Sequence, residues 1–161
     1  MSRPEPIWKR IRLAENTFIG WFLARYRAAP DHPAKLRIWR WLYALAGRPE
    51  VLVRYAGTAR MRLNLEDCVQ ERIVTHGFYE PEVWETLAGY ATGDEVVWDI
   101  GAHVGGVAIR AALDPRVRAV HCFEPNPHTA ARLRANLALN PDLPITLHQV
   151  ALGDRTETRT L

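Results

Sequence analysis

Apolar positions change their spacing along this chain, from helical spacing in the first third to short apolar runs in the last. Helical spacing over Glu5–Ala28 and Ala34–Ala46 predicts two amphipathic helices, with prolines between them and Gly47 at the end of the second. From residue 51 the pattern becomes alternating, VLVRYAG followed by ARMRLNL, which predicts a short β-hairpin over residues 51–65.

Two further helices are expected between the hairpin and the next apolar run. Asp67 is a suitable N-cap for a helix through His76, and Gly77 would end that helix. Pro81 is suited to the first turn of a helix that continues to Tyr90. Both segments therefore have sequence signals at their boundaries as well as apolar residues within them.

The last third of the chain alternates short apolar runs with helical segments. The predicted order is strand Glu95–Ile100, helix Val104–Leu113, strand Arg118–Phe123, helix Pro127–Leu139 and strand Ile145–Val150. This order predicts an α/β fold with a Rossmann-like, doubly wound parallel sheet. We expect two parts: a helical N-terminal segment, 1–50, and an incomplete α/β domain, 51–161.

Charge is distributed unevenly over the chain. The net charge is +3, but residues 1–60 carry 12 Lys and Arg against 4 Asp and Glu, so the remainder carries a net charge of −5. A basic, tryptophan-bearing segment suits an anionic partner, and amphipathic helices over residues 1–46 could lie on an anionic membrane surface. The simpler interpretation is a helical cap that packs on the domain that follows.

Cysteine and histidine usage indicates no metal or disulfide chemistry. Cys68 and Cys122 are far apart and match no metal or redox spacing, and the six histidines form no pair with ligand spacing. We find no secretory signal and no uncharged run long enough to span a bilayer. These features favour a cytoplasmic protein, with peripheral membrane contact as an option.

The stretch EVVWDIGAHVGG, residues 95–106, is the most informative part of the sequence. It predicts a buried strand, a glycine turn and a helix, and in open α/β sheets ligands bind at the carboxyl ends of the strands. Asp99 precedes the turn, Gly101 and Gly105 let the backbone approach a ligand, and Glu124 ends the next strand, where a carboxylate can accept from both ribose hydroxyls. Because the spacing is Gly-x-x-x-Gly, a sulfonium nucleoside with an amino-acid tail fits better than a dinucleotide.

Four segments in order resemble a known family. They are Gly-Phe-Tyr-Glu-Pro (77–81), Asp-Ile-Gly-Ala-His-Val-Gly (99–105), His-Cys-Phe-Glu-Pro-Asn-Pro (121–127) and Val-Ala-Leu-Gly-Asp (150–154). Together they resemble the class I S-adenosylmethionine-dependent methyltransferases and, more narrowly, the FkbM-type methyltransferases. The resemblance covers about residues 60–155.

The resemblance implies S-adenosylmethionine as cofactor and a set of residues around it. The methionyl part would lie near Asp99, Gly101 and Gly105, and the ribose near Glu124. Pro125 and Asn126 would shape the adenine side and Ala151 and Leu152 would face the adenine. Tyr79 and Glu80 would close over the cofactor. The full expected set is Tyr79, Glu80, Asp99, Gly101, Ala102, Gly105, Glu124, Pro125, Asn126, Ala151 and Leu152.

Several of these residues also have purely structural explanations. Gly105 could serve only helix–strand packing, Glu80 could only cap the helix at Pro81, and Asn126 could be only the N-cap of the next helix. His103 lies in the turn and could be drawn as a general base, but a local hydrogen bond in the loop is the simpler role. No catalytic residue is assigned.

The end of the sequence leaves the family pattern incomplete. In the family a later strand carries a Lys-x-Asp-x-Glu-Gly-type motif beside the methyl acceptor, and the sequence ends at Leu161 before any such motif. The family's next strand would pair with Glu95–Ile100, so this strand is expected to have an open edge that favours self-association. The 51–65 hairpin or another chain could cover the edge; truncation of the sequence is the explanation we favour.

Three functions are compatible with these residues and motifs. The leading one is S-adenosylmethionine-dependent methyl transfer to a hydroxyl of a sugar or natural product, with this chain holding mainly the cofactor-binding half. The alternative is a non-catalytic binding or membrane-surface module built on a degenerate methyltransferase fold. A Rossmann dehydrogenase comes third because of the glycine spacing. The expected partner is a small-molecule acceptor, with no nucleic acid.

Overall fold

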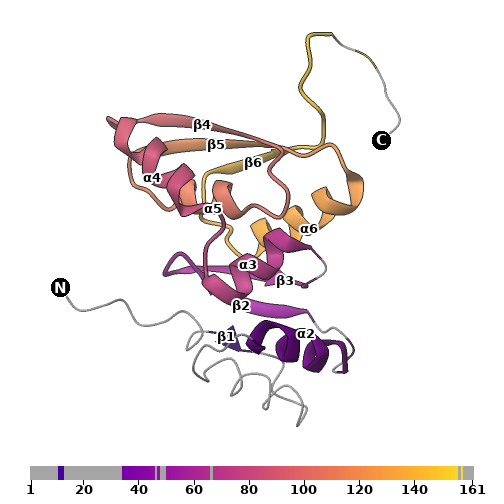
Figure 1. The fold of residues 1–161 in the computed structure, drawn as a ribbon. Coiled ribbons are helices and arrows are strands. Elements are labelled where there is room, and N and C mark those ends of the chain that lie inside the picture. Colours follow the sequence, from indigo (N-terminus) through magenta and orange to yellow (C-terminus); the bar gives the residue numbers. More distant parts are fainter. Residues whose placement is uncertain are drawn as a thin grey trace, which may run out of the picture. The chain divides into compact units, whose positions relative to one another are not determined.

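The chain divides into two compact units, Met1–Tyr79 and Glu80–Leu161. A computed structural model describes residues 11–12, 34–45, 47, 50–65, 67–155 and 157 (Figure 1). Each unit has its own three-stranded sheet, antiparallel in the first unit and parallel in the second.

The N-terminal unit contains the predicted hairpin. Strands β2 (Val51–Tyr55) and β3 (Ala59–Leu63) pair antiparallel, and β1 (Ile11–Arg12) pairs with β2, in the order β1-β2-β3. The helix predicted over 5–28 is therefore wrong at residues 11 and 12, because backbone pairing with a distant strand replaced the local helical pattern there. The rest of that range lies outside the described residues.

The hairpin alternates strictly between a buried and an exposed face. In both strands the first, third and fifth residues are buried and the other two are exposed. Val51 and Met61 are fully buried, whereas the outward positions include Arg54, Arg60 and Arg62. A period of two is expected when one sheet face is covered and the other faces water.

Two helices complete the described part of this unit. Helix α2 (Lys35–Leu45) and helix α3 (Cys68–His76) lie close to their predicted bounds. The Arg40 guanidinium donates to both carboxylate oxygens of Glu71, at 2.7 and 2.6 Å, and so joins the two helices. Helix α3 is capped as predicted: the Asp67 side chain accepts from the Gln70 N–H, and Gly77 ends the helix at φ 84°.

The C-terminal unit has the predicted order of helices and strands. Its elements are α4 (Pro81–Tyr90), β4 (Glu95–Ile100), α5 (Gly106–Ala112), β5 (Val117–Phe123), α6 (Pro127–Ala138) and β6 (Ile145–His148). The strands pair in parallel in the order β4-β5-β6. The predicted Rossmann-like α/β fold is confirmed.

Two predicted boundaries differ from the structure for a local reason. Helix α5 begins at Gly106 rather than Val104, because the turn between Gly101 and Gly105 contains three residues with positive φ, and this conformation cannot belong to a right-handed helix. Strand β6 ends at His148 rather than Val150, so its pairing with β5 stops opposite Phe123.

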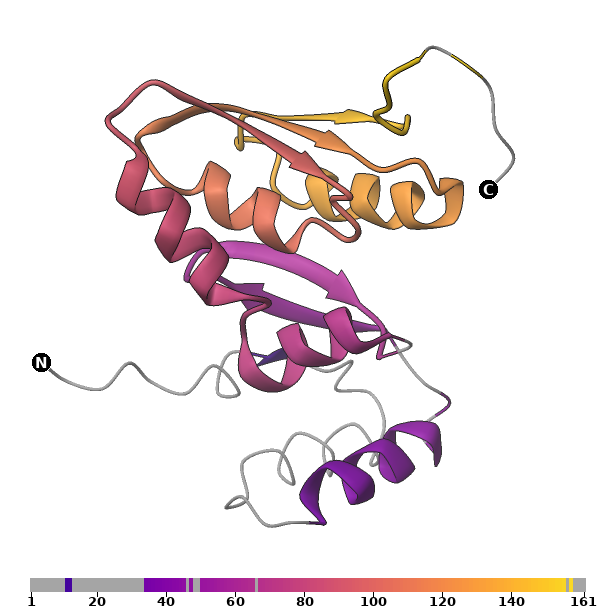
Figure 2. The same ribbon diagram turned by 45° about the horizontal axis from the view of Figure 1, so that its top comes forward.

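Helices α5 and α6 lie on the same side of the parallel sheet (Figures 1 and 2). The core between them and the sheet includes Ala108, Val120, Cys122 and Leu133, each fully buried. Side chains on the other face of β4 are exposed: Val96 by 42%, Trp98 by 59% and Ile100 by 65%. One face of this sheet is therefore covered by helices, and the other presents apolar side chains to solvent in the described part of the chain.

Arg116 ties the end of α4 to the start of β5. Its guanidinium donates to both carboxylate oxygens of Asp114 and to the backbone carbonyls of Ala88 and Ala91, which are at the end of α4. The hydrogen bonds from Arg116 lower the pKa of Asp114 to about 2. The end of the sheet where the strands begin, opposite the glycine turn, is thus fixed by a polar network.

Candidate functional site

The glycine turn after β4 is tied to the end of β5. The N–H groups of Gly101 and Ala102 both donate to the carbonyl of Phe123, at 2.9 and 3.2 Å. Gly101 has φ 86° and Gly105 has φ 92°, a conformation that side chains with a Cβ rarely adopt. The turn therefore brings the carboxyl end of β4 beside that of β5.

The two glycines are needed for different reasons. A Cβ at Gly105 would lie 2.7 Å from Cδ1 of Leu133 in α6, so the packing alternative considered for Gly105 is part of its role. A Cβ at Gly101 would have nothing within 4 Å. Because no atom apart from those of its chain neighbours lies within 4 Å of that position, a ligand can approach the backbone of Gly101.

Glu124 holds the turn through its side chain. One carboxylate oxygen accepts from the His103 N–H and the other from the Asn126 N–H, each at 3.0 Å. The residue is only 7% exposed. A carboxylate can accept about four hydrogen bonds, so about two remain for ligand hydroxyls. The sequence indicated a ligand role for Glu124 but not this structural one.

Asp99 has acceptor capacity that the described residues do not use. Its Oδ2 atom is buried and accepts no hydrogen bond from them. Burial raises the pKa of Asp99, and the nearby Glu124 charge raises it further, while a hydrogen bond from the Ala108 N–H opposes this shift. A buried carboxylate oxygen without a donor is costly unless a ligand supplies one. A cationic group would meet both the missing donor and the excess negative charge.

Two of the expected site residues, Ala102 and Asn126, have structural roles in the turn region. Ala102 is 4% exposed and belongs to the core, so only its backbone faces the turn. Asn126 caps α6, because its Oδ1 accepts from the N–H groups of His128 and Thr129. Pro125 is half-buried between Glu124 and Asn126. The capping role considered for Asn126 is confirmed, and its role toward adenine stays a prediction.

Ala151 and Leu152 follow β6 and are both exposed. The end of β6 lies beside that of β5, since the Glu124 N–H donates to the His148 carbonyl. The three strands thus end at one edge of the sheet, as expected for parallel strands. The contact of Ala151 and Leu152 with adenine stays a prediction.

Tyr79 and Glu80 lie at the junction of the two units. Glu80 occupies the N-cap position of α4 in a left-handed conformation, φ 46°, and its side chain makes no capping hydrogen bond. The capping alternative for this side chain is therefore not observed. A left-handed backbone at a residue other than glycine is strained, and such strain is commonest at functional positions.

His103 has a structural role through its backbone. Its φ of 49° is also left-handed, and its N–H donates to Glu124. This bond is the local loop role that the sequence favoured. The described residues contain no group of three or more His, Cys, Asp or Glu that could hold a metal ion.

The face of the parallel sheet that α5 and α6 do not cover carries a cluster of aromatic and histidine rings that was not predicted from the sequence. The Phe123 and His148 rings stack at 4.8 Å, Trp98 lies 5.3 Å from Phe123, and His121 Nδ1 lies 3.0 Å from His148 Nε2. The alternation of side chains along β5 could have indicated it, because His121 and Phe123 face away from the buried Cys122.

Taken together, the C-terminal unit is a three-stranded parallel sheet with helices on one face, and the carboxylates of Asp99 and Glu124 lie at its strand ends. The structure of the chain is similar to that of a proposed transferase, PH0793, from Pyrococcus horikoshii, with a TM-score of 0.50 and 20% identity over 74% of this chain and 48% of that chain. It is also similar to P. horikoshii TYW2 in complex with MeSAdo, with a TM-score of 0.49 and 17% identity over 71% of this chain and 47% of that one. M. jannaschii TYW2 in complex with AdoMet gives a TM-score of 0.45 and 21% identity over 63% and 43%.

The likeness to the P. horikoshii transferase structure supports the Rossmann-like α/β fold. This chain spans about half the length of these solved structures. No protein-family model matches the sequence, and no curated protein matches it.

Proposed function

We propose that this chain binds S-adenosylmethionine at the carboxyl ends of β4 and β5 and serves methyl transfer. The observation that carries the proposal is the buried Oδ2 of Asp99, which accepts no hydrogen bond from the described residues. Asp99 lies near the end of β4, two residues before Gly101, where a Cβ would have nothing within 4 Å. The ammonium group of an amino-acid tail supplies both the donor and the positive charge that this oxygen requires.

The other parts of the cofactor have matching groups on this chain. Glu124 has acceptor capacity for two ribose hydroxyls, and its position is fixed by two backbone donors. Gly101 lets the backbone approach the ligand. S-adenosylmethionine, when bound, supplies a methyl group on a positively charged sulfur. Asp99 and Glu124 would bind and orient the cofactor, and neither residue is assigned a role in proton transfer.

The acceptor and the narrower family belong to the same proposal. The motifs at 77–81, 99–105, 121–127 and 150–154 support an FkbM-type enzyme that methylates a hydroxyl of a sugar or natural product. Activity of the whole protein, a small-molecule acceptor rather than nucleic acid, and a cytoplasmic location are parts of this proposal. Tyr79 and Glu80 are proposed to close over the cofactor.

Calorimetry of the full chain with S-adenosylmethionine and with NAD tests the proposal. We expect S-adenosylmethionine to bind and NAD not to bind. Glu124→Gln should weaken binding by roughly tenfold to a hundredfold, since a hydrogen bond to a charged group contributes about 1.5–3 kcal/mol. The matched control is Glu85→Gln, an exposed carboxylate on α4. Binding of NAD alone, or equal affinities for the two variants, would overturn the proposal.

A second candidate is a membrane-surface module, and exposed side chains on α2 favour it. Trp41 is 62% exposed and Leu45 is 57% exposed, with the exposed Arg37 on the same helix. Tryptophan and arginine together suit an anionic membrane interface. No helix among the described residues is long and apolar enough to cross a membrane.

Flotation of the full chain with anionic vesicles at low salt tests this second candidate. The chain should float with the vesicles, and Trp41→Ser should lose most of the bound fraction. The control is Trp98→Ser, an exposed tryptophan in the other unit. A wild-type chain that stays at the bottom of the gradient rules the candidate out.

A further inference from the structure

Asn136 is a polar residue at a fully buried position of α6. The helix turns Ala130, Leu133 and Asn136 toward the core, and all three residues are completely buried. The first two are apolar, as expected for the inner face of a helix, whereas an amide side chain loses its hydrogen bonds to water on burial. Buried polar groups are hydrogen-bonded within the protein, so the partner of this amide indicates what it does.

The Asn136 side chain donates to the glycine turn. Its Nδ2 atom lies 3.0 Å from the carbonyl oxygen of Val104, which is 32 positions earlier in the chain. Val104 lies between Gly101 and Gly105 and is itself fully buried. The same helix packs against the turn, since a Cβ at Gly105 would lie 2.7 Å from Cδ1 of Leu133. Helix α6 thus fixes the turn by a hydrogen bond and by packing.

The restrained turn has an unfavourable backbone conformation. The Gly105 N–H donates to the Ala102 carbonyl at 2.8 Å, which closes a four-residue turn with His103 and Val104 at its centre. His103 has φ 49°, a conformation that favours glycine, asparagine or aspartate. Both central residues are held from outside the turn, His103 by the bond from its N–H to Glu124 and Val104 by the amide of α6. A strained backbone persists only where such surrounding contacts fix it.

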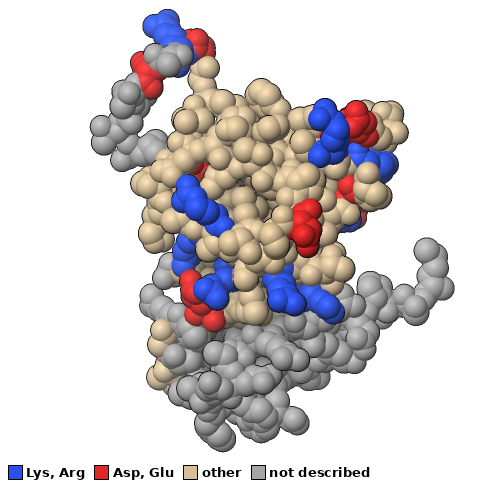
Figure 3. Space-filling model, turned by 180° about the vertical axis from the view of Figure 1, so that it is seen from behind, with Lys and Arg blue, Asp and Glu red and all other residues tan. Residues whose placement is uncertain are grey.

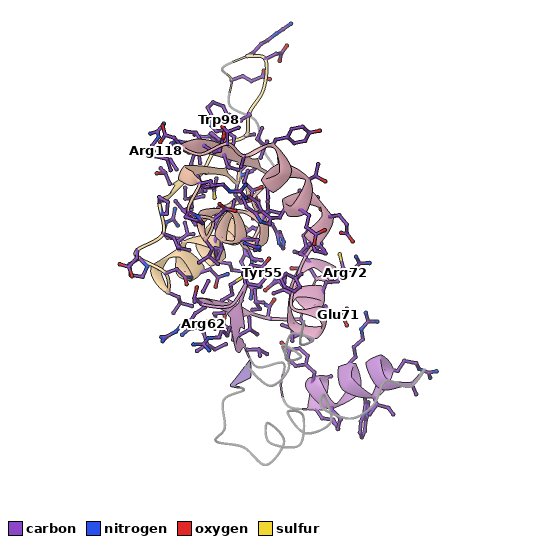
Figure 4. All side chains as sticks on the ribbon, turned by 90° about the vertical axis from the view of Figure 1, so that its left-hand side faces the viewer. Tyr55, Arg62, Glu71, Arg72, Trp98 and Arg118 are labelled. Carbon is purple, nitrogen blue, oxygen red and sulfur yellow. The ribbon has the colours of Figure 1, made fainter. Side chains whose placement is uncertain are left out.

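The hydrogen bond from Asn136 is on the side of the sheet toward which the site carboxylate projects. Trp98 projects away from the helices (Figure 4), so Asp99, the next residue of β4, projects toward them. In agreement with this, Asp99 accepts a hydrogen bond from the Ala108 N–H of α5. Helix α6 lies on the same side of the sheet as α5 (Figures 1 and 2). The amide therefore fixes the turn from the side on which Asp99 lies.

Asn136 fixes the turn without adding a charge. The surface has a broad area with few charged side chains (Figure 3), and the charges of the proposed site lie below the surface: Asp99 Oδ2 is buried, and Glu124 is 7% exposed. A lysine or arginine could also donate to a backbone carbonyl, but its charge would neutralise part of the negative charge there. A neutral amide leaves both carboxylates to a cationic ligand.

We propose, building on the function proposed above, that Asn136 is a positioning residue for the cofactor: its amide keeps the glycine turn in the conformation that binds S-adenosylmethionine. Asn136 acts through the Val104 carbonyl and is assigned no contact with the ligand. Without the amide the turn adopts other conformations. The observed affinity then falls in proportion to the fraction of chains that keep the binding conformation.

Calorimetry of the full chain with S-adenosylmethionine tests this role. Asn136→Leu removes the donor and introduces an apolar side chain of similar length that favours the helix, and it should weaken binding by roughly tenfold or more. Asn140→Leu is the matched control: the Asn140 amide donates to the Asn136 carbonyl at 2.8 Å, a bond at the end of α6 that does not reach the turn. This variant should keep the wild-type affinity.

The calorimetric outcomes separate this role from the proposed function. A wild-type chain that does not bind S-adenosylmethionine overturns the proposed function and the role of Asn136 with it. A wild-type chain that binds, with the same affinity for Asn136→Leu, overturns the role of Asn136 alone. If Asn136→Leu does not fold, Asn136→Ala takes its place in this measurement and in the next.

Amide hydrogen exchange distinguishes a loosened turn from a general loss of stability. The N–H groups of His103 and Gly105 are hydrogen-bonded at 3.0 and 2.8 Å, and in Asn136→Leu both should exchange about tenfold faster or more. Saturating S-adenosylmethionine should restore slow exchange. The control is the Ala130 N–H, which donates to the Asn126 carbonyl at 2.8 Å at the start of α6 and should exchange as in the wild type. Equal acceleration in the turn and in α6, or unchanged exchange in the turn, overturns the proposal.

Discussion

The two units differ in how completely their groups are satisfied. In the N-terminal unit, the outward positions of the hairpin include arginines, and Asp67 accepts from both the backbone and the side chain of Gln70. In the C-terminal unit, the outward positions of β4 are apolar and exposed, and Asp99 keeps a buried oxygen that the described residues leave unpaired. The first pattern is typical of a surface whose polar groups are paired within the chain. The second is typical of a surface that binds a ligand or a partner.

The largest effect should come from the buried face of the hairpin. Met61 is fully buried, so Met61→Ala should lower the free energy of unfolding by about 2–5 kcal/mol, because a cavity adds to the lost transfer energy. Urea unfolding followed by circular dichroism measures the change. Arg62→Ala, at the neighbouring outward position, should stay within about 0.5 kcal/mol. Equal losses would mean that the two faces of the hairpin are not distinct.

The next effect should come from the turn of the C-terminal unit. Gly105→Ala should cost about 1–3 kcal/mol, since the residue has φ 92° and its Cβ would press on Leu133. Gly89→Ala is the matched control: it lies within α4 with nothing near its Cβ, and it should raise stability by up to about 1 kcal/mol. A Gly105→Ala chain as stable as the wild type would show that the turn is not strained.

Substitution of a carboxylate should change the stability in opposite directions in the two units. Asp67→Ala should lower the stability by about 0.5–2 kcal/mol, as expected for the loss of an N-cap. Asp99→Asn should instead raise the melting temperature slightly, because it removes a buried charge that Glu124 repels. A lower melting temperature for Asp99→Asn would show that this carboxylate stabilises the fold.

The Asp99→Asn effect should also depend on pH. Because the pKa of Asp99 is raised in the folded state, the folded chain binds more protons than the unfolded chain between the usual aspartate pKa and the raised one. The ionisation of Asp99 therefore lowers the stability of the wild type as pH rises through this interval. Thermal unfolding should give a small difference between the two chains at acidic pH and a larger one at neutral pH. A difference that shrinks as pH rises would contradict this assignment.

Much of the fold could be predicted because its signals are local. Asp67 and Gly77 mark the ends of α3, and Pro81 and Pro127 begin α4 and α6. Strand β1 could not be predicted in this way, since its pairing with β2 depends on residues about forty positions away. Local periodicity favoured a helix there, and a long-range contact decided otherwise.

The candidate site was predictable in position but not in its hydrogen bonds. The spacing of Asp99, Gly101 and Glu124 indicated which residues meet at the strand ends. That Glu124 holds the turn through His103, while Asp99 keeps an oxygen that the described residues leave unpaired, depends on how β4 and β5 lie beside each other. Such details follow from tertiary contacts rather than from residue types.

The most direct test of the proposed cofactor site is the affinity of Gly101→Ala for S-adenosylmethionine, compared with that of Gly93→Ala. Both glycines have positive φ and open space around the missing Cβ, so the two substitutions should cost the fold a similar amount. Only Gly101 lies at the proposed site. Calorimetry should show wild-type affinity for Gly93→Ala and at least roughly tenfold weaker binding for Gly101→Ala. Equal affinities for the two variants would contradict a cofactor site at the end of β4.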